Sequence, residues 1–194
     1  GDYSGLGGWI YQSTDRGQSW QRLFGTEYIV QIAVSPDFAT DHRLYLVATQ
    51  RVLRSDDAGE TATAQPFWDF NHTARALALS PSFREDQTIV AIGNGVYRST
   101  DGGMTWAAAA GPPPVSADSQ GWQAGRLYWN PNGRLYMTIS ATDGVAPFRY
   151  HTQLWVSADG GQNWSRINNA PDRPVAGLAA GPSTLGGTNE TIYL

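Results

Sequence analysis

Hydrophobic and polar residues alternate in short runs along this chain. The segments 30–34 and 75–79 place their larger apolar side chains at every second position, and each ends at a Ser-Pro pair. A period of two is typical of β-strands, and a proline marks a strand end because it has no N–H to donate to the ladder. A small residue, Ala33, Ala78 or Ala179, lies between the larger ones in three such runs, which suits strands crowded near an axis.

One short motif, Ser-x-Asp-x-Gly-x-x-Trp, occurs four times. The copies begin at Ser13, Ser55, Ser99 and Ser157, at intervals of 42, 44 and 58 residues, and the second copy has Ala62 in place of its tryptophan. A repeat of roughly 40–50 residues that is rich in short strands is typical of a β-propeller, which is built blade by blade.

The expected fold is therefore all-β, a β-propeller of four-stranded antiparallel blades. Residues 7–24 predict a half blade, residues 28–70, 74–110 and 124–167 predict whole blades, and residues 175–194 predict a second half blade. The two half blades sum to one, so the strands either close as a four-bladed ring or belong to a larger propeller of about five to eight blades. The abrupt ends favour the larger propeller.

Each motif is predicted to form a hairpin turn. Its aspartate can accept backbone N–H bonds across the turn, its glycine supplies a positive φ, and its tryptophan offers a large apolar face. One carboxylate per turn is too few for a calcium site. The residues assigned this structural role are Ser13, Asp15, Gly17, Trp20, Ser55, Asp57, Gly59, Ser99, Asp101, Gly103, Trp106, Ser157, Asp159, Gly161 and Trp164.

These four motifs resemble the Asp-box, or BNR, repeat of propellers in the sialidase, sortilin and xyloglucanase-like superfamily. The resemblance covers nearly the whole chain through its repeats. It implies that the motifs are structural and lie away from the face that binds ligands.

The candidate ligand face is therefore the one opposite the motifs. Two long loops, 107–125 and 141–153, are expected on that face beside one blade, where binding residues tend to collect on a rigid scaffold. The alternative is that they are decorative, or are ordered by a partner subunit. The candidate ligand-binding residues are Asp118, Trp122, Asp143, Phe148, Arg149 and Tyr150.

Composition bears on which partners, membrane segments and metal sites are expected. The net charge of −4 argues against a nucleic-acid partner, and no apolar run reaches the length of a transmembrane segment. The chain has no cysteine, and its three histidines, His42, His72 and His151, lack metal-ligand spacing. Neither a metal site nor a cofactor is expected.

The function predicted from these features is that of a non-catalytic extracellular binding or assembly module. It would recognise a carbohydrate or a protein and lie outside the cell, on its surface or in the periplasm. One alternative is a segment of a secreted glycoside hydrolase, either sialidase or xyloglucanase-like. Another is a structural subunit of a larger surface or membrane-associated complex, in which further blades or other subunits cover the sheet edges.

Overall fold

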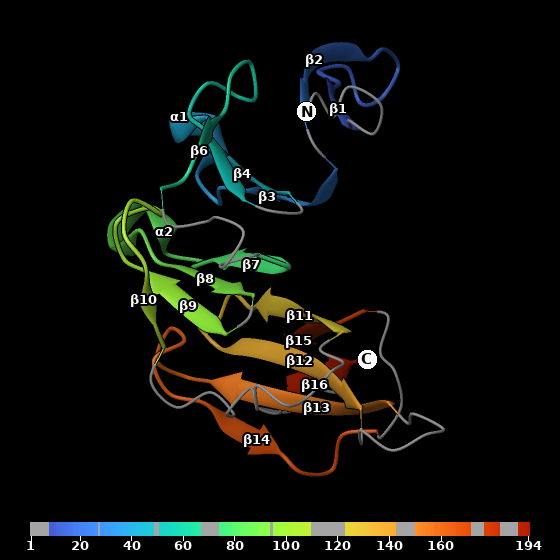
Figure 1. Cartoon of the computed structure of the whole chain (residues 1–194), viewed down its shortest axis with the longest axis vertical. Helices are drawn as coiled ribbons and strands as arrows, with labels where there is room; N and C mark the ends of the chain where they lie inside the picture. The colour runs from blue at the N-terminus through green and yellow to red at the C-terminus, as the bar shows by residue number, and fades with distance from the viewer. Residues whose placement is uncertain are drawn as a thin grey trace, which may run out of the picture.

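Five antiparallel sheets follow one another along an open arc (Figure 1). The computed structural model describes residues 8–26, 28–48, 51–66, 74–93, 95–109, 123–142, 150–171, 177–182 and 190–194. The first four sheets pack face to face in succession, so that this part of the arc is a row of stacked sheets (Figure 1).

In the described part of the chain, three of the sheets have four strands and the two terminal sheets have two. The chain begins with the hairpin β1 (Gly8–Gln12) and β2 (Gln21–Thr26) and ends with the hairpin β15 (Ala179–Pro182) and β16 (Glu190–Tyr193). Between them lie β3 (Ile29–Val34), β4 (Leu44–Ala48), β5 (Val52–Ser55) and β6 (Thr63–Ala64), then β7 (Ala76–Leu79), β8 (Ile89–Ile92), β9 (Val96–Ser99) and β10 (Ala107–Ala108), then β11 (Gln123–Trp129), β12 (Leu135–Thr142), β13 (Tyr150–Ser157) and β14 (Ser165–Ile167).

The expectation of a mostly β protein with four-stranded antiparallel sheets is confirmed. A closed ring is not shown, because the two terminal hairpins lie at opposite ends of the arc (Figure 1).

Two short helices, α1 (Phe38–Asp41) and α2 (Phe83–Asp86), join the first and second strands of their sheets and were not predicted. The Ser-Pro segments determine both. Ser35 donates to the Asp41 carboxylate and Ser80 to that of Asp86, each over 2.7 Å. Among the described residues, no helix has the length and apolar character that crossing a membrane requires.

Strand register divides the apolar side chains between two interfaces. In β4, Leu44 and Leu46 pack toward the β1–β2 hairpin, whereas Tyr45 and Val47 pack toward the β7–β10 sheet. This is the alternation of a strand that is buried on both faces. Among the described residues, the hydrophobic core is therefore a series of three separate layers between the first four sheets.

Two of the three motif tryptophans belong to these layers. Trp106 packs into the layer between the β3–β6 and β7–β10 sheets, and Trp164 packs into the next. Ala62 takes the same place beside the β1–β2 hairpin, where the layer has four buried residues rather than the ten around Trp106. Trp20 is 64% exposed.

A repeated polar contact also joins successive sheets. The residue just before each of the first three motifs donates to a backbone carbonyl in the next motif along the chain. Gln12 Nε2 donates to Ala58 O over 3.4 Å, Arg54 Nη1 to Gly102 O over 3.2 Å, and Arg98 Nε to Gly160 O over 2.9 Å.

The contact around Gly102 has a further donor in the core. The buried Tyr45 hydroxyl donates to Gly102 O over 2.7 Å. Burial raises the pKa of Tyr45 to about 12, so its hydroxyl keeps the proton that it donates.

Replacing Tyr45 by phenylalanine should therefore lower the free energy of unfolding by about 1 kcal/mol, because it removes a buried hydrogen bond and leaves the ring in place. Urea titration followed by circular dichroism measures the change. Tyr11→Phe is the control, since Tyr11 is 53% exposed. Equal stabilities of the two variants would contradict this role of the hydroxyl.

Candidate functional site

The four motif turns share one hydrogen-bond pattern. The serine hydroxyl donates to the aspartate in every turn, at distances of 2.7–2.8 Å. The same hydroxyl accepts the N–H of the last motif glycine. The aspartate accepts the backbone N–H four residues ahead at 2.9 Å, and also the side chain of that residue.

The backbone of the turns explains their glycines. Gly17, Gly59, Gly103 and Gly161 have φ between 85° and 92°, a region that side chains disfavour. The residue before each of them also has a positive φ, which Arg16 and Ala58 tolerate in the first two turns. The four aspartate carboxylates thus accept hydrogen bonds within the turns and hold their conformation.

Hydrogen bonds also shift the titration of these groups. The Ser19 hydroxyl is the main cause that lowers the pKa of Asp15 from 3.8 to about 2, and the Thr61 hydroxyl does the same for Asp57. For Asp101 and Asp159 burial opposes the charge, yet the hydrogen bonds prevail and the pKa of each is still lowered.

The two interfaces between four-stranded sheets differ at their turn edge. In the first, Arg43 donates to Asp56 over 2.8 Å and to Gln87 over 2.6 Å. Arg54 holds the same Asp56 carboxylate. These charged side chains and the Tyr45 ring occupy the edge of this interface.

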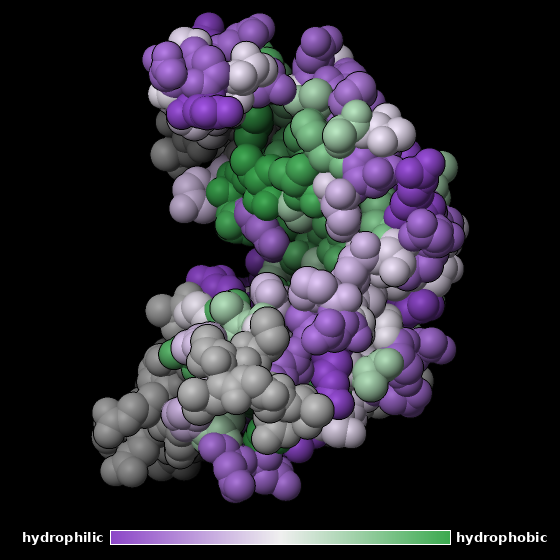
Figure 2. Space-filling model, turned by 180° about the vertical axis from the view of Figure 1, so that it is seen from behind, coloured by the Kyte–Doolittle hydropathy of each residue, from purple (hydrophilic) through white to green (hydrophobic). Residues whose placement is uncertain are grey.

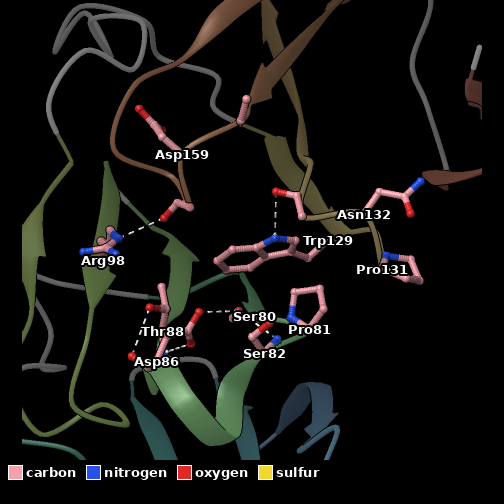
Figure 3. Close-up of a pocket in the computed structure, with 13 residues that line it drawn as sticks. Ser80, Pro81, Ser82, Asp86, Thr88, Arg98, Trp129, Pro131, Asn132 and Asp159 are labelled. Carbon is pink, nitrogen blue, oxygen red and sulfur yellow. Dashed lines mark hydrogen bonds between the residues drawn. The ribbon is translucent and has the colours of Figure 1, made fainter.

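In the second interface, smaller residues stand at the same repeat positions. Thr88 replaces Arg43, Val90 replaces Tyr45, and Thr100 replaces Asp56. Of these three residues, Thr88 lines a pocket of about 460 Å³ (Figure 3). It is lined by Ser80, Pro81, Ser82, Asp86, Thr88, Arg98, Trp129, Pro131, Asn132, Gly133, Ala158, Asp159 and Gly160.

Trp129 and Arg98 are the most distinctive groups of this pocket. The Trp129 ring extends into it from the end of β11, with Pro81 beside the ring and Arg98 on the far side of the space (Figure 3). The indole N–H is bonded to Gly133 O at 3.3 Å, which fixes the ring. Arg98 uses Nε on Gly160, and its two Nη groups have no hydrogen-bond partner among the described residues.

The pocket lies on the motif side of the sheets, opposite the face that was predicted to bind ligands. Five of the six predicted ligand residues, Asp118, Trp122, Asp143, Phe148 and Arg149, lie outside the described residues. Tyr150 begins β13, and its backbone pairs with Thr142. The sequence signal for the pocket lies in the repeats, where Thr88 stands at the position that Arg43 holds one repeat earlier.

The histidines do not converge in the part of the chain that is described. His42 caps α1 in the left-handed conformation, and its ring meets Phe38 edge-on at 6.1 Å. His151 lies on β13, two sheets further along the arc, and His72 is outside the described residues. No group of three histidine, cysteine or acidic side chains able to hold a metal ion occurs among the described residues.

Comparison with known proteins gives a family. The family model "common central domain of tyrosinase" matches residues 10–170. A tyrosinase from Streptomyces glaucescens is 31% identical over 145 residues, which cover 69% of this chain and 48% of that enzyme. By this sequence match, the chain belongs to the tyrosinase family. It spans about half the length of that relative.

Other similarities are weaker. Xyloglucanase Xgh74A from Acetivibrio thermocellus is 24% identical over 200 residues, which cover 84% of this chain and 23% of that enzyme. The crystal structure of an ancestral GH74 enzyme superposes with a TM-score of 0.44 at 16% identity, over 84% of this chain and 29% of that one.

The tyrosinase match overturns the predicted membership of the Asp-box superfamily. It also overturns the predictions that rested on that membership. These are the non-catalytic module for carbohydrate or protein, the glycoside hydrolase, the structural subunit, and the preference for a protein that is not an enzyme. The family named by the match consists of phenol oxidases that bind copper.

Copper does not fit the residues of this chain. Protein copper sites are built largely from imidazole and, for soft sites, thiolate ligands. The whole sequence offers three histidines and no cysteine, and His42 and His151 belong to sheets separated by a third. The family match and the structure therefore disagree on chemistry, and the described residues support no copper-dependent step.

Acid should destabilise the four turns. A carboxylate with a lowered pKa stabilises the fold above its unfolded pKa and loses that contribution as the pH falls through its folded pKa. For Asp15 and Asp57 this window runs from 3.8 down to about 2. The temperature at the midpoint of thermal unfolding should accordingly decrease as the pH is lowered from 3.8 to about 2.

The Asp57→Asn variant should lose less stability over the same window, because its amide does not titrate there. Glu60→Gln is the matched control in the same turn, since the Glu60 carboxylate makes no hydrogen bond to described residues. Identical pH profiles of the Asp57→Asn variant and the parent would contradict the role of the turn carboxylate.

Proposed function

We propose that this chain binds a small phenol in the pocket beside Trp129 and Arg98, without copper at that site. The observation that carries the proposal is the opening of the second sheet interface beside Thr88, at the position where the first interface has Arg43 bonded to Asp56 and Gln87. The match with a tyrosinase is the reason for proposing an aromatic hydroxyl compound as the class of ligand.

The pocket offers both surfaces that a phenol needs. An aromatic ring stacks favourably on the face of an indole, and the Trp129 ring is held in place by its bond to Gly133. A phenol hydroxyl accepts one hydrogen bond and donates another. The Arg98 Nη groups can donate to it, whereas the carboxylates of Asp86 and Asp159 in the pocket wall already accept hydrogen bonds within their own turns.

The arrangement of the sheets supports a proposal about the fold as well. We propose that the sheets are successive blades of a propeller, as the repeats predict. The support is that equivalent residues, Gln12, Arg54 and Arg98, make equivalent contacts from one sheet to the next. A location outside the cell, on its surface or in the periplasm remains a prediction from the sequence.

Binding of p-cresol, with toluene as the probe that lacks only the hydroxyl, tests the function. The indole N–H resonance of Trp129, identified with Trp129→Phe, should shift on titration with p-cresol. We expect a Kd on the order of 1 mM for so small a ligand. Toluene should bind roughly tenfold more weakly, because it leaves Arg98 without the hydrogen bond.

The Thr88→Arg variant should abolish the shift, since it restores at this interface the residue type that occupies the other. Thr14→Arg, on the exposed turn of the first motif, is the matched control and should bind normally. Equal affinity for p-cresol and toluene, or normal binding by Thr88→Arg, would refute the proposed site.

Copper analysis and oxygen uptake separate phenol binding from phenol oxidation. The purified chain should retain no stoichiometric copper after exposure to Cu²⁺ and exchange into metal-free buffer, and it should consume no oxygen with p-cresol. Retained copper with oxygen uptake would overturn the copper-free proposal and support oxidase chemistry.

A further inference from the structure

The β3 strand leaves an apolar face uncovered. Ile32 and Val34 are 49% and 52% exposed, and Val30 beside them is 47% exposed. Leu77 and Leu79 hold the positions in β7 that correspond to Ile32 and Val34, and they are 1% and 9% exposed. Apolar surface gathers on the concave side of the arc (Figure 2).

The difference follows from what precedes each sheet. Leu77 and Leu79 pack against a complete sheet, whose inner strands supply Ala33 and Tyr45 to the layer. Within the described residues, the sheet before β3 consists of β1 and β2. Because β1 leads into its motif as β5, β9 and β13 do, this hairpin corresponds to the two outer strands. The residues described before β3 include no inner pair that would cover Ile32 and Val34.

A pair of that kind lies at the other end of the chain. In β15 and β16, Ala179 corresponds to Ala33 and Tyr193 to Tyr45 by their places in the repeat. Tyr193 is 61% exposed, whereas Tyr45 is fully buried. The face of β15–β16 that would cover a following sheet is therefore open, just as the face of β3 that needs covering is open.

We propose that the β15–β16 hairpin of one copy completes the β1–β2 sheet of a second copy. The strand order of the shared sheet would be β15-β16-β1-β2, which matches the order of the three complete sheets. Tyr193 and Ala179 then cover Ile32 and Val34 of the second copy. The two unpaired edges, which would otherwise template aggregation, pair with each other.

A second copy suits the geometry better than the chain's own terminal hairpin. The two hairpins of one chain lie at opposite ends of the arc, which opens like the letter C (Figures 1 and 2). Two copies joined twice would form a closed ring with two-fold symmetry. Three sheets from each copy and two shared sheets make eight, within the usual range of about four to eight blades.

The internal interface predicts a specific hydrogen bond at the junction. Tyr45 donates to Gly102 O in the following sheet, and Ala58 O is the carbonyl at the same place in the second motif. The Tyr193 hydroxyl of one copy should therefore donate to Ala58 O of the second copy.

Sedimentation velocity over a range of concentrations tests the association. The parent chain should form a dimer, and Ile32→Glu should shift it to a monomer. Met104→Glu is the matched control, because Met104 is 60% exposed in a motif turn outside the proposed junction. A parent that stays monomeric at every concentration would overturn the proposal and leave the β3 face to further strands of a longer polypeptide.

Mixing variants tests the head-to-tail direction. Ile32→Glu impairs one face and Tyr193→Glu impairs the other, so each variant alone should be monomeric. An equimolar mixture should regain dimers, since the intact hairpin of the first variant can join the intact β3 face of the second. Dimers of the Tyr193→Glu variant alone would indicate that like faces meet and would refute the head-to-tail arrangement.

Discussion

The hydrogen bond from the motif serine to its aspartate is the interaction on which the rest of this structure depends. It closes the turn so that the backbone adopts two successive positive φ angles. That conformation directs one carbonyl, at Ala58, Gly102 or Gly160, toward the preceding sheet, where a side chain donates to it. A local turn thus sets the spacing between sheets, and the apolar layers fill the spacing that the turns define.

The same scaffold accommodates very different side chains at the turn edge of its sheet interfaces. An interface filled by Arg43, Asp56 and Tyr45 and an interface that is open beside Trp129 share the same turn geometry. Turn residues such as Asp159 and Asp86 also line the pocket, so the two interfaces differ in the residues added around a shared turn. The sequence match to tyrosinase names a family, but chemistry depends on which donors converge, and the described donors do not converge on a metal ion.

Much of the scaffold could be predicted from the sequence, because its determinants are local. The period of two along 75–79, the proline after each inner strand and the Ser-x-Asp-x-Gly spacing act within a few residues, and they give strands and turns. The pocket could not be read in the same way, because Thr88 and Trp129 lie on different sheets and meet only through packing. The α1 and α2 helices were missed because a serine and an aspartate six residues apart close each of them.

The unequal apolar layers have a consequence for motion. Ala62 leaves a small layer beneath the β1–β2 hairpin, whereas β8 is buried throughout between two large ones. Free energies of local opening follow buried apolar contact, so this protein should not open as one cooperative unit. Amide hydrogens of β1 and β2 should exchange with solvent long before those of β8, and the chain becomes progressively more rigid from its first hairpin toward the middle of the arc.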